Sequence, residues 1–281
     1  MTFAAEYLAQ LEAFAAIGPL PRVRALHLPP EPSAEDNKGE FCALELDDGS
    51  LGLSYVLLDD TLAQLREGAD SFGLAGADPL EVARGYLYND GGHGIRKTLG
   101  FAAANALTRC LFDRAGYVPP EAGDSIGGIA PQPGDHIGMI GLFKPLLGRI
   151  LASGARLTVV ELKEELAGAA DGYVVTLDAD SLLDCTKVVA TGTLLLNDTL
   201  DRMLESCRNA RWFAMVGPSA GCLPDALFAR GVTLLGGSWI TDGPAFVETL
   251  KSGEKRSGCA RKSAISRDGY PGTDALLQRL W

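Results

Sequence analysis

The hydrophobic positions in the first part of the chain predict helices around one short hairpin. Apolar residues recur every three or four positions near the N-terminus and predict an amphipathic helix that ends at Gly18. Residues 42–59 form two apolar stretches around the turn sequence Asp47-Asp48-Gly49, which is typical of a β-hairpin. Further helical patterns cover residues 61–66, 79–87 and 96–114. Together these elements predict a small α+β domain.

Later in the chain, strongly apolar segments alternate with helical ones. Strands are predicted over 136–142, 155–162, 187–193, 211–217 and 231–237, and helices over 144–153, 199–207, 224–230 and 244–251. Strands this apolar need both faces covered, as in a parallel sheet with helices on both sides. The pattern therefore predicts an α/β fold with a Rossmann-like domain, whose ligand site lies at the carboxyl ends of the strands.

A segment rich in glycine and proline separates these two patterns. Residues 121–135 read EAGDSIGGIAPQPGD and carry almost no periodic apolar signal. We expect one domain over residues 1–125 and the Rossmann-like domain over residues 126–281.

Composition narrows the classes of partner. The 281 residues are 47% hydrophobic and 22% charged, which is typical of a globular protein. The net charge of −11 argues against nucleic acid and anionic membrane surfaces as partners. Residues 251–267 nevertheless carry +5, so the rest carries −16. We expect this basic segment to be a loop, either solvated or folded over the strand ends.

Nothing in the pattern indicates secretion or a membrane helix. Glu6 and Glu12 interrupt the N-terminal apolar residues, and no basic stretch precedes them. The longest uncharged runs fall short of the roughly 18 residues that a membrane helix needs. Six cysteines are scattered without a C-x-x-C pair, which is typical of reduced thiols. We expect a cytoplasmic protein.

Candidate ligand contacts follow the first predicted strand of the Rossmann-like domain. Gly138 and Gly141 precede Phe143 and Lys144, and Pro145 stands at a predicted helix start. Free backbone N–H groups there could hold an anion beside Lys144. The alternative is that the glycines serve tight packing, because the third glycine of a dinucleotide fingerprint is missing.

Polar residues also follow the next strands. Glu161 ends the second strand, where an acid could bind ribose hydroxyls or simply be solvated. Thr191 and Thr193 place hydroxyls at the third strand end, although threonine is also common in strands. Asn197 follows as a ligand contact or as a helix cap.

The fourth strand leads into Gly217-Pro218-Ser219-Ala220-Gly221-Cys222. We expect Ser219 and Cys222 at a positive helix end, which favours anions and lowers the pKa of a thiol. The sequence also matches the G-x-S-x-G elbow of serine hydrolases. A proline directly before the serine and the lack of a late histidine argue against that chemistry.

Among the three histidines, His93 is the best candidate ligand. It lies between glycines in Asn89-Asp90-Gly91-Gly92-His93-Gly94, so we expect it on a loop, either as a ligand contact or as loop filler. The imidazole of His93 and the thiol of Cys222 are the candidate metal ligands. This donor pair suits zinc, iron, nickel or copper.

Four stretches taken together resemble a known family. They are residues 134–143, residues 191–200, the segment from Gly217 to Val232, and Ala102-Ala103-Ala104-Asn105-Ala106. The chain resembles the two-domain heavy-metal chelation proteins, which join an enolase-N-terminal-like domain to a Rossmann-like domain. It departs from their pattern at Lys144 and at Ala220-Gly221-Cys222, so Cys222 does not carry over as a ligand of the family.

The resemblance implies a cleft between the two domains and the handling of a metal ion or metal chelate. We therefore predict that the protein binds or processes such a small molecule there. The alternative is an enzyme that uses a nucleotide or another anionic small molecule in the same cleft, and a noncatalytic scaffold is a third reading. A homodimer is compatible with the sequence, which leaves the ligand and any catalysed reaction open.

Overall fold

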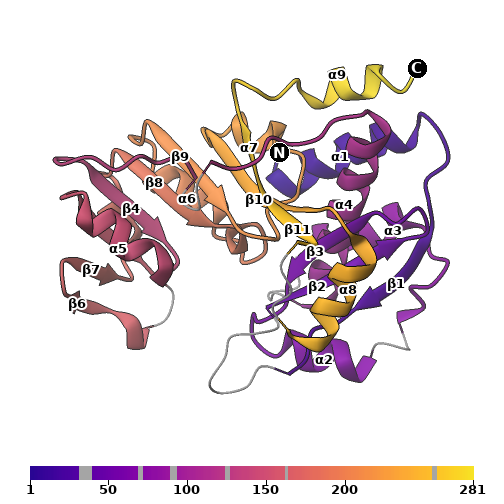
Figure 1. Cartoon of the computed structure of the whole chain (residues 1–281), viewed down its shortest axis with the longest axis horizontal. Helices are drawn as coiled ribbons and strands as arrows, with labels where there is room; N and C mark the ends of the chain where they lie inside the picture. The colour runs from indigo at the N-terminus through magenta and orange to yellow at the C-terminus, as the bar shows by residue number, and fades with distance from the viewer. Residues whose placement is uncertain (32–39, 69–71, 89–93, 124–126, 162–163, 255–257) are drawn as a thin grey trace.

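The computed structural model describes the whole chain except residues 32–39, 69–71, 89–93, 124–126, 162–163 and 255–257. Its first domain is a three-stranded antiparallel sheet, ordered β1-β2-β3, with helices packed against it (Figure 1). The elements are α1 (Phe3–Ala15), β1 (Val23–His27), β2 (Phe41–Leu46), β3 (Leu51–Tyr55), α2 (Thr61–Gly68), α3 (Pro79–Ala83), the 3₁₀ helix η2 (Arg84–Leu87) and α4 (Ile95–Arg114). The predicted hairpin is β2 and β3, and β1 was not predicted.

Helix α4 is the central element of the first domain because it lies directly on β3. A side chain at Gly52 of β3 would place its Cβ 2.1 Å from the carbonyl oxygen of Ala102 and 2.1 Å from the backbone nitrogen of Ala106. Such overlap is impossible for any residue but glycine. The small residues of α4 and Gly52 thus allow a helix and a strand to pack backbone to backbone.

The second sheet has eight strands in the order β11-β10-β9-β8-β4-β5-β7-β6. Its elements are β4 (His136–Ile140), α5 (Lys144–Ala152), β5 (Arg156–Val160), η3 (Glu164–Leu166), β6 (Gly168–Ala170), β7 (Tyr173–Thr176), η4 (Ala179–Leu182), β8 (Lys187–Thr191), η5 (Gly192–Leu195), α6 (Leu200–Ser206), β9 (Trp212–Val216), α7 (Asp225–Phe228), β10 (Leu234–Ile240), α8 (Gly243–Ser252), β11 (Ala260–Ser266) and α9 (Thr273–Gln278). Strands β7, β5, β4, β8, β9 and β10 are parallel neighbours, whereas β6 and β11 pair antiparallel at the two edges.

This order confirms the predicted Rossmann-like fold. The six parallel strands run, in spatial order, third, second, first, fourth, fifth and sixth in the chain, which is the doubly wound arrangement. The order reverses between β4 and β8. In such sheets the ligand crevice lies beyond the carboxyl ends of the two strands at this switch point.

Part of the basic segment is a strand rather than the loop that we expected, and Lys255 and Arg256 lie outside the described residues. Residues 260–266 form the edge strand β11, which pairs with β10 along seven residues from Leu234 to Ile240. Ser263 and Ile265 of β11 are buried, whereas Arg261 is half-buried and Lys262 is exposed. Strand β11 is four strands away from β4, about 19 Å at the usual strand spacing. It therefore does not cover the β4 and β8 ends.

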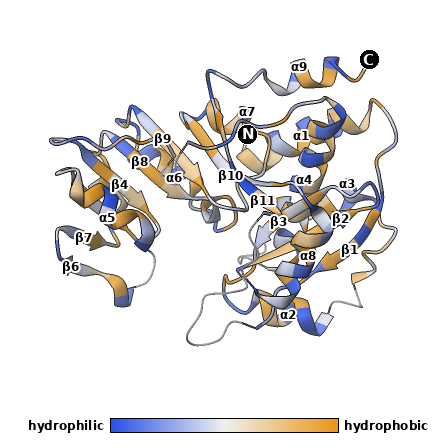
Figure 2. Ribbon diagram, in the orientation of Figure 1, coloured by the Kyte–Doolittle hydropathy of each residue, from blue (hydrophilic) through white to orange (hydrophobic). Residues whose placement is uncertain are grey.

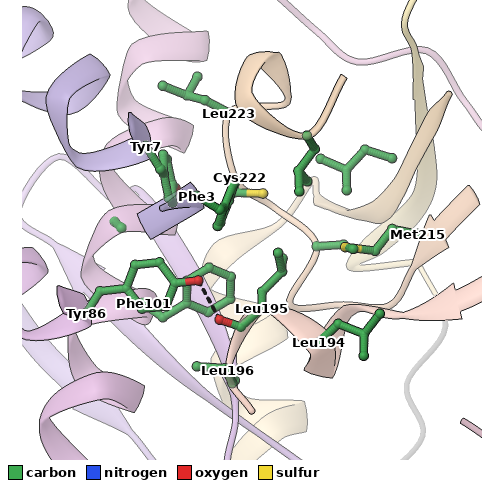
Figure 3. Close-up of a cluster of buried hydrophobic side chains, with 14 of the residues drawn as sticks. Phe3, Tyr7, Tyr86, Phe101, Leu194, Leu195, Leu196, Met215, Cys222 and Leu223 are labelled. Carbon is green, nitrogen blue, oxygen red and sulfur yellow. Dashed lines mark hydrogen bonds between the residues drawn. The ribbon is translucent and has the colours of Figure 1, made fainter. Parts of the chain in front are cut away.

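The two domains share one core. Buried residues of α1 and α4 belong to the same apolar cluster as residues of β8, β9 and the β9–α7 loop. Figure 3 shows Tyr7, Tyr86 and Phe101 of the first domain beside Leu195 and Cys222 of the Rossmann-like domain. Helix α8 packs on the first domain, because its Phe246, Val247 and Leu250 lie against Leu51 and Leu53 of β3.

Figure 2 shows the ribbon coloured by hydropathy, with hydrophobic residues in the strands of both sheets. No helix within the described ranges is long and apolar enough to cross a membrane.

Candidate functional site

The carboxyl ends of β4 and β8 meet closely at the switch point. Gly141, directly after β4, has a left-handed backbone with φ +83°, and a Cβ there would lie 3.1 Å from Cγ2 of Thr191 at the end of β8. Glycine is required for both reasons. The two loops that leave these strands therefore start in contact with each other.

The other predicted residues of the β4–α5 loop have separate roles. Gly138 lies inside β4, where a Cβ would clash with Leu182 of η4 at 2.7 Å, so it serves tight packing. Phe143 is the N-cap residue of α5, and its N–H donates to Sδ of Met139 at 3.4 Å. Lys144 is exposed at the first position of the helix.

Glu161 changes the electrostatic picture of this loop. Its Oε1 accepts a hydrogen bond from the Leu142 N–H at 2.5 Å. The backbone N–H of Leu142, which we expected to be available to an anionic ligand, thus already donates to a carboxylate of the protein. A second anion at the same N–H would meet like-charge repulsion. The Leu142 N–H is therefore not one of the free amides that the sequence predicted for an anion at the start of α5.

The negative charge of Glu161 also affects a residue of the first domain, Tyr55. Tyr55 at the end of β3 has a raised pKa because the phenol is partly buried, and the negative charges of Glu40 and Glu161 raise that pKa further. Burial in turn raises the pKa of Glu40. Tyr55 of the first domain thus feels the charge of Glu161 of the Rossmann-like domain, an association that no local sequence pattern could reveal.

Thr191 and Thr193 present a pair of hydroxyls at the end of β8. Their Oγ1 atoms lie 2.6 Å apart, and Thr191 Oγ1 also accepts from the Thr193 N–H at 3.3 Å, which begins η5. Both side chains are partly exposed. They can offer donor and acceptor groups to a ligand at the switch point.

Asn197 stabilises its own turn. Its Oδ1 accepts from Thr199 Oγ1 at 2.6 Å and from the Thr199 N–H at 3.3 Å. Its neighbour Asp198 has a left-handed backbone with φ +57° and pairs with the buried ammonium of Lys97 on α4. The turn after η5 is thereby tied to the first domain.

Ser219 and Cys222 do not lie at a helix end. Helix α7 spans only the four residues Asp225–Phe228, so both residues precede it within a buried loop. Cys222 is 0% exposed, and burial raises the pKa of its thiol to about 12. This is the opposite of the lowered pKa that we expected, because apolar side chains from the first domain surround the sulfur.

Ser219 is 2% exposed and packs beside Gly192, where a Cβ would lie 3.2 Å from its Oγ. Neither of the described histidines, His27 and His136, lies where it could act as the general base of a serine hydrolase. His27 of β1 pairs with Glu45 of β2 at 2.7 Å. His136 lies at the amino end of β4, beside Thr158. The amino ends of the strands are opposite to the loop that carries Ser219.

The candidate metal ligands do not assemble within the described residues. His93 lies outside them, so its predicted role stays a prediction. Within the described ranges, no group of three or more His, Cys, Asp or Glu side chains could hold a metal ion. The donors near the switch point are oxygens, whereas the buried Cys222 is protonated at neutral pH. These residues do not fit a fully protein-coordinated transition metal.

Asn105 of α4 fixes the position of the β9–α7 loop, a role that we did not predict. Its Nδ2 donates to the carbonyl of Leu53 at 2.8 Å and to that of Ser219 at 3.1 Å. Its Oδ1 accepts from the Tyr7 hydroxyl at 3.0 Å. One buried amide thus joins α1, β3 and the Rossmann-like domain.

Two cavities lie between the domains. One of about 50 Å³ is lined by Asn105, Arg109 and Trp239, among others, and the Arg109 guanidinium lies 3.8 Å from the centre of the Trp239 ring. The other, of about 190 Å³, is bordered by Tyr86 and Lys97 on one side and by residues of the 194–201 segment on the other. Leu194, which follows Thr193 in the chain, lines the larger cavity, whereas Thr191 and Thr193 do not.

Known structures share this fold. A protein of unknown function from the DUF364 family of Desulfitobacterium hafniense DCB-2 matches with a TM-score of 0.67 and 20% identity, covering 95% of this chain and 100% of that chain. A DUF364 protein of unknown function from Pyrococcus horikoshii matches with a TM-score of 0.63 and 20% identity, covering 92% and 99%. At these identities the likeness establishes the fold.

Sequence comparison finds the same family. An uncharacterized protein of Methanocaldococcus jannaschii is 27% identical over 149 residues, which cover 53% of this chain and 56% of that protein. Residues 128–267 match the model of DUF364, whose description reads "Putative heavy-metal chelation". Residues 128–267, which make up most of the Rossmann-like domain, thus match the DUF364 family, and the chain shares the fold of the DUF364 structures.

Proposed function

We propose that this protein binds a metal chelate, a small molecule that carries its metal ion already coordinated, in a cleft between the two domains. The family description supports a connection with heavy metals. The observation that carries the proposal is the geometry of the β4–β8 switch point, where Glu161 accepts from the Leu142 N–H at 2.5 Å and the hydroxyls of Thr191 and Thr193 lie 2.6 Å apart. Glu40 and Tyr55 of the first domain interact electrostatically with each other, and Tyr55 with Glu161.

The donor inventory favours a chelate over a bare ion. The raised pKa of Tyr55 makes its phenol a poor metal ligand, and the two remaining carboxylates are fewer than the three protein ligands that a catalytic zinc site uses. The described residues supply no group of three or more His, Cys, Asp or Glu side chains. A chelator that provides the remaining ligands removes this difficulty. The metal is then cargo, held partly by the small molecule and partly by oxygen atoms of the protein.

The hydroxyl pair at the end of β8 would recognise the organic part of the ligand. Thr191 and Thr193 are partly exposed and lie in contact with the β4 loop. Hydroxyls donate to the carboxylate oxygens of a chelator without adding charge to the site. The carboxylate of Glu161 would face the metal side of the same ligand.

A nucleotide has less support in this site. The β4–α5 loop lacks the third glycine of the dinucleotide fingerprint, and the Leu142 N–H already donates to Glu161. A pyrophosphate placed there would meet a carboxylate rather than free amides.

A titration of the purified protein separates these ligands. Isothermal titration calorimetry with the Ni²⁺ and Fe³⁺ complexes of nitrilotriacetate is compared with metal-free nitrilotriacetate, Ni²⁺ alone and NADH. We expect a saturable signal with a loaded complex and none with the metal-free chelator or NADH. Saturable binding of NADH together with no response to either complex would refute the proposal.

Substitution of one carboxylate locates the site. Glu161→Gln keeps an oxygen that can accept from the Leu142 N–H but removes the charge, so we expect binding of the loaded complex to weaken by about tenfold or more, or ~1.4 kcal/mol. Glu164→Gln is the matched control, because Glu164 is exposed on η3 only three positions further along. Equal affinities for the two variants would remove Glu161 from the site.

A further inference from the structure

The two edges of the large sheet are treated differently. The outer edge of β11 is covered by the segment between the two domains, because the Ala122 N–H donates to the Lys262 carbonyl and the Ala264 N–H donates to the Pro120 carbonyl, at 3.1 and 2.9 Å. The opposite edge is β6, which pairs only with β7 within the part of the chain that the structure describes. All three residues of β6 are exposed.

Strand β6 presents backbone groups to this open side. Residues of an antiparallel strand direct their N–H and C=O groups alternately to one neighbour and to the other. Of the residues from Gly168 to Ala170, at least one therefore points its backbone groups away from β7. Their side chains are small or absent, so nothing on β6 itself blocks the approach of another strand.

An apolar patch flanks the open edge. Val174 is 51% exposed, Leu177 43% and Leu166 37%, and Val174 lies opposite Ala169 in the strand register. Within β7, Val174 is exposed whereas the next residue, Val175, is buried. We call Leu166, Ala169, Val174 and Leu177 the edge patch. Figure 1 shows β6 and β7 at the end of the molecule farthest from the first domain.

The charge around the edge patch defines the partner. Residues 164–180 contain five acids, all exposed, and no lysine or arginine; the acids are Glu164, Glu165, Asp171, Asp178 and Asp180. A second copy of this chain would bring two such acidic edges together and would be repelled. A strand with basic side chains would be attracted instead.

We propose that β6 is a docking edge for an extended segment of a partner protein in which lysine or arginine alternates with apolar residues. The segment adds to the sheet as a ninth strand through backbone hydrogen bonds to β6. Its apolar side chains cover the edge patch, and its basic side chains pair with the surrounding carboxylates.

A synthetic peptide tests this edge. A short fluorescent peptide of alternating lysine and valine is compared, by anisotropy at physiological salt, with an analogue that is N-methylated at every residue, which keeps the side-chain charge but has no backbone N–H on either edge. We expect the analogue to bind at least about tenfold more weakly, because the backbone hydrogen bonds to β6 are lost. Equal binding of the two peptides would overturn the proposal, since charge alone would then explain it.

Two variants locate the binding. Val174→Ser removes apolar surface from the edge patch and should weaken binding of the unmethylated peptide by about fivefold or more. Val118→Ser is the control, because Val118 is 60% exposed and lies away from β6. Equal effects of the two variants would place the peptide elsewhere. A self-associated protein in sedimentation, dissociated by Val174→Ser, would identify a second copy as the occupant and overturn the choice of partner.

Discussion

Replacement of Asn105 by leucine should uncouple the β9–α7 loop from the first domain. Leucine has a similar volume, so the change removes hydrogen bonds without leaving a large cavity. The carbonyls of Leu53 and Ser219 each lose the Nδ2 donor, whereas the Tyr7 hydroxyl keeps its contact with Thr108 Oγ1 at 2.6 Å. The loss therefore falls on two buried acceptors.

The cost follows from these two acceptors. A buried polar group that loses its partner costs about 1–3 kcal/mol, so Asn105→Leu should lower the free energy of unfolding by about 3 kcal/mol. For a chain of this length, that corresponds to a fall of roughly 6–12 °C in melting temperature. Urea denaturation followed by circular dichroism, together with calorimetry, measures both quantities.

A matched amide provides the control. Asn209 also donates from Nδ2 to a carbonyl, that of Leu183 at 2.9 Å, but it is exposed, so water replaces the lost partner. Asn209→Leu should cost less than about 1 kcal/mol. If Asn105→Leu were no more destabilising than Asn209→Leu, the hydrogen bonds of the Asn105 amide would not stabilise the contact between the domains.

Two further predictions concern ionisable groups. The hydrogen bond from Lys187 lowers the pKa of Asp135 below 3.8, so the pair stabilises the fold above that pH and the stabilisation is lost as pH falls through the lowered value. Asp135→Asn should therefore lower the urea midpoint at neutral pH, and the difference should shrink as pH falls below the ordinary carboxyl pKa of 3.8; a difference independent of pH would contradict this. All six cysteines are buried and the pKa of Cys222 is about 12, so iodoacetamide at mildly alkaline pH should label Cys222 only after denaturation. Rapid labelling of Cys222 in the native protein, read by mass spectrometry, would show that this loop opens.

The parallel sheet could be predicted because its strands are continuous apolar runs that need two covered faces. Strand β11 could not, because Arg261 and Lys262 obscure the alternation of Ser263 and Ile265. The length of α7 was also overestimated, and with it the electrostatic environment of Cys222.

The proposed site contains residues predicted from the sequence only where it depends on the Rossmann-like topology. Glu161, Thr191 and Thr193 became candidates because the carboxyl ends of parallel strands meet at one edge of the sheet. Tyr55 and Glu40 were missed because they come from the first domain, and no local pattern indicates which distant residues face a strand end. Gly138 was misplaced because the sequence does not reveal that η4 packs on β4.

The pairing of residues 120–122 with β11 affects how this protein can be divided or recombined. The predicted boundary falls just after these residues, and the family model begins at residue 128. A fragment cut there would leave the β11 edge uncovered and would strip α8 of the sheet on which it packs. Recombination that moved the Rossmann-like half alone would thus yield a module prone to aggregate, so the two halves are expected to be inherited and expressed together.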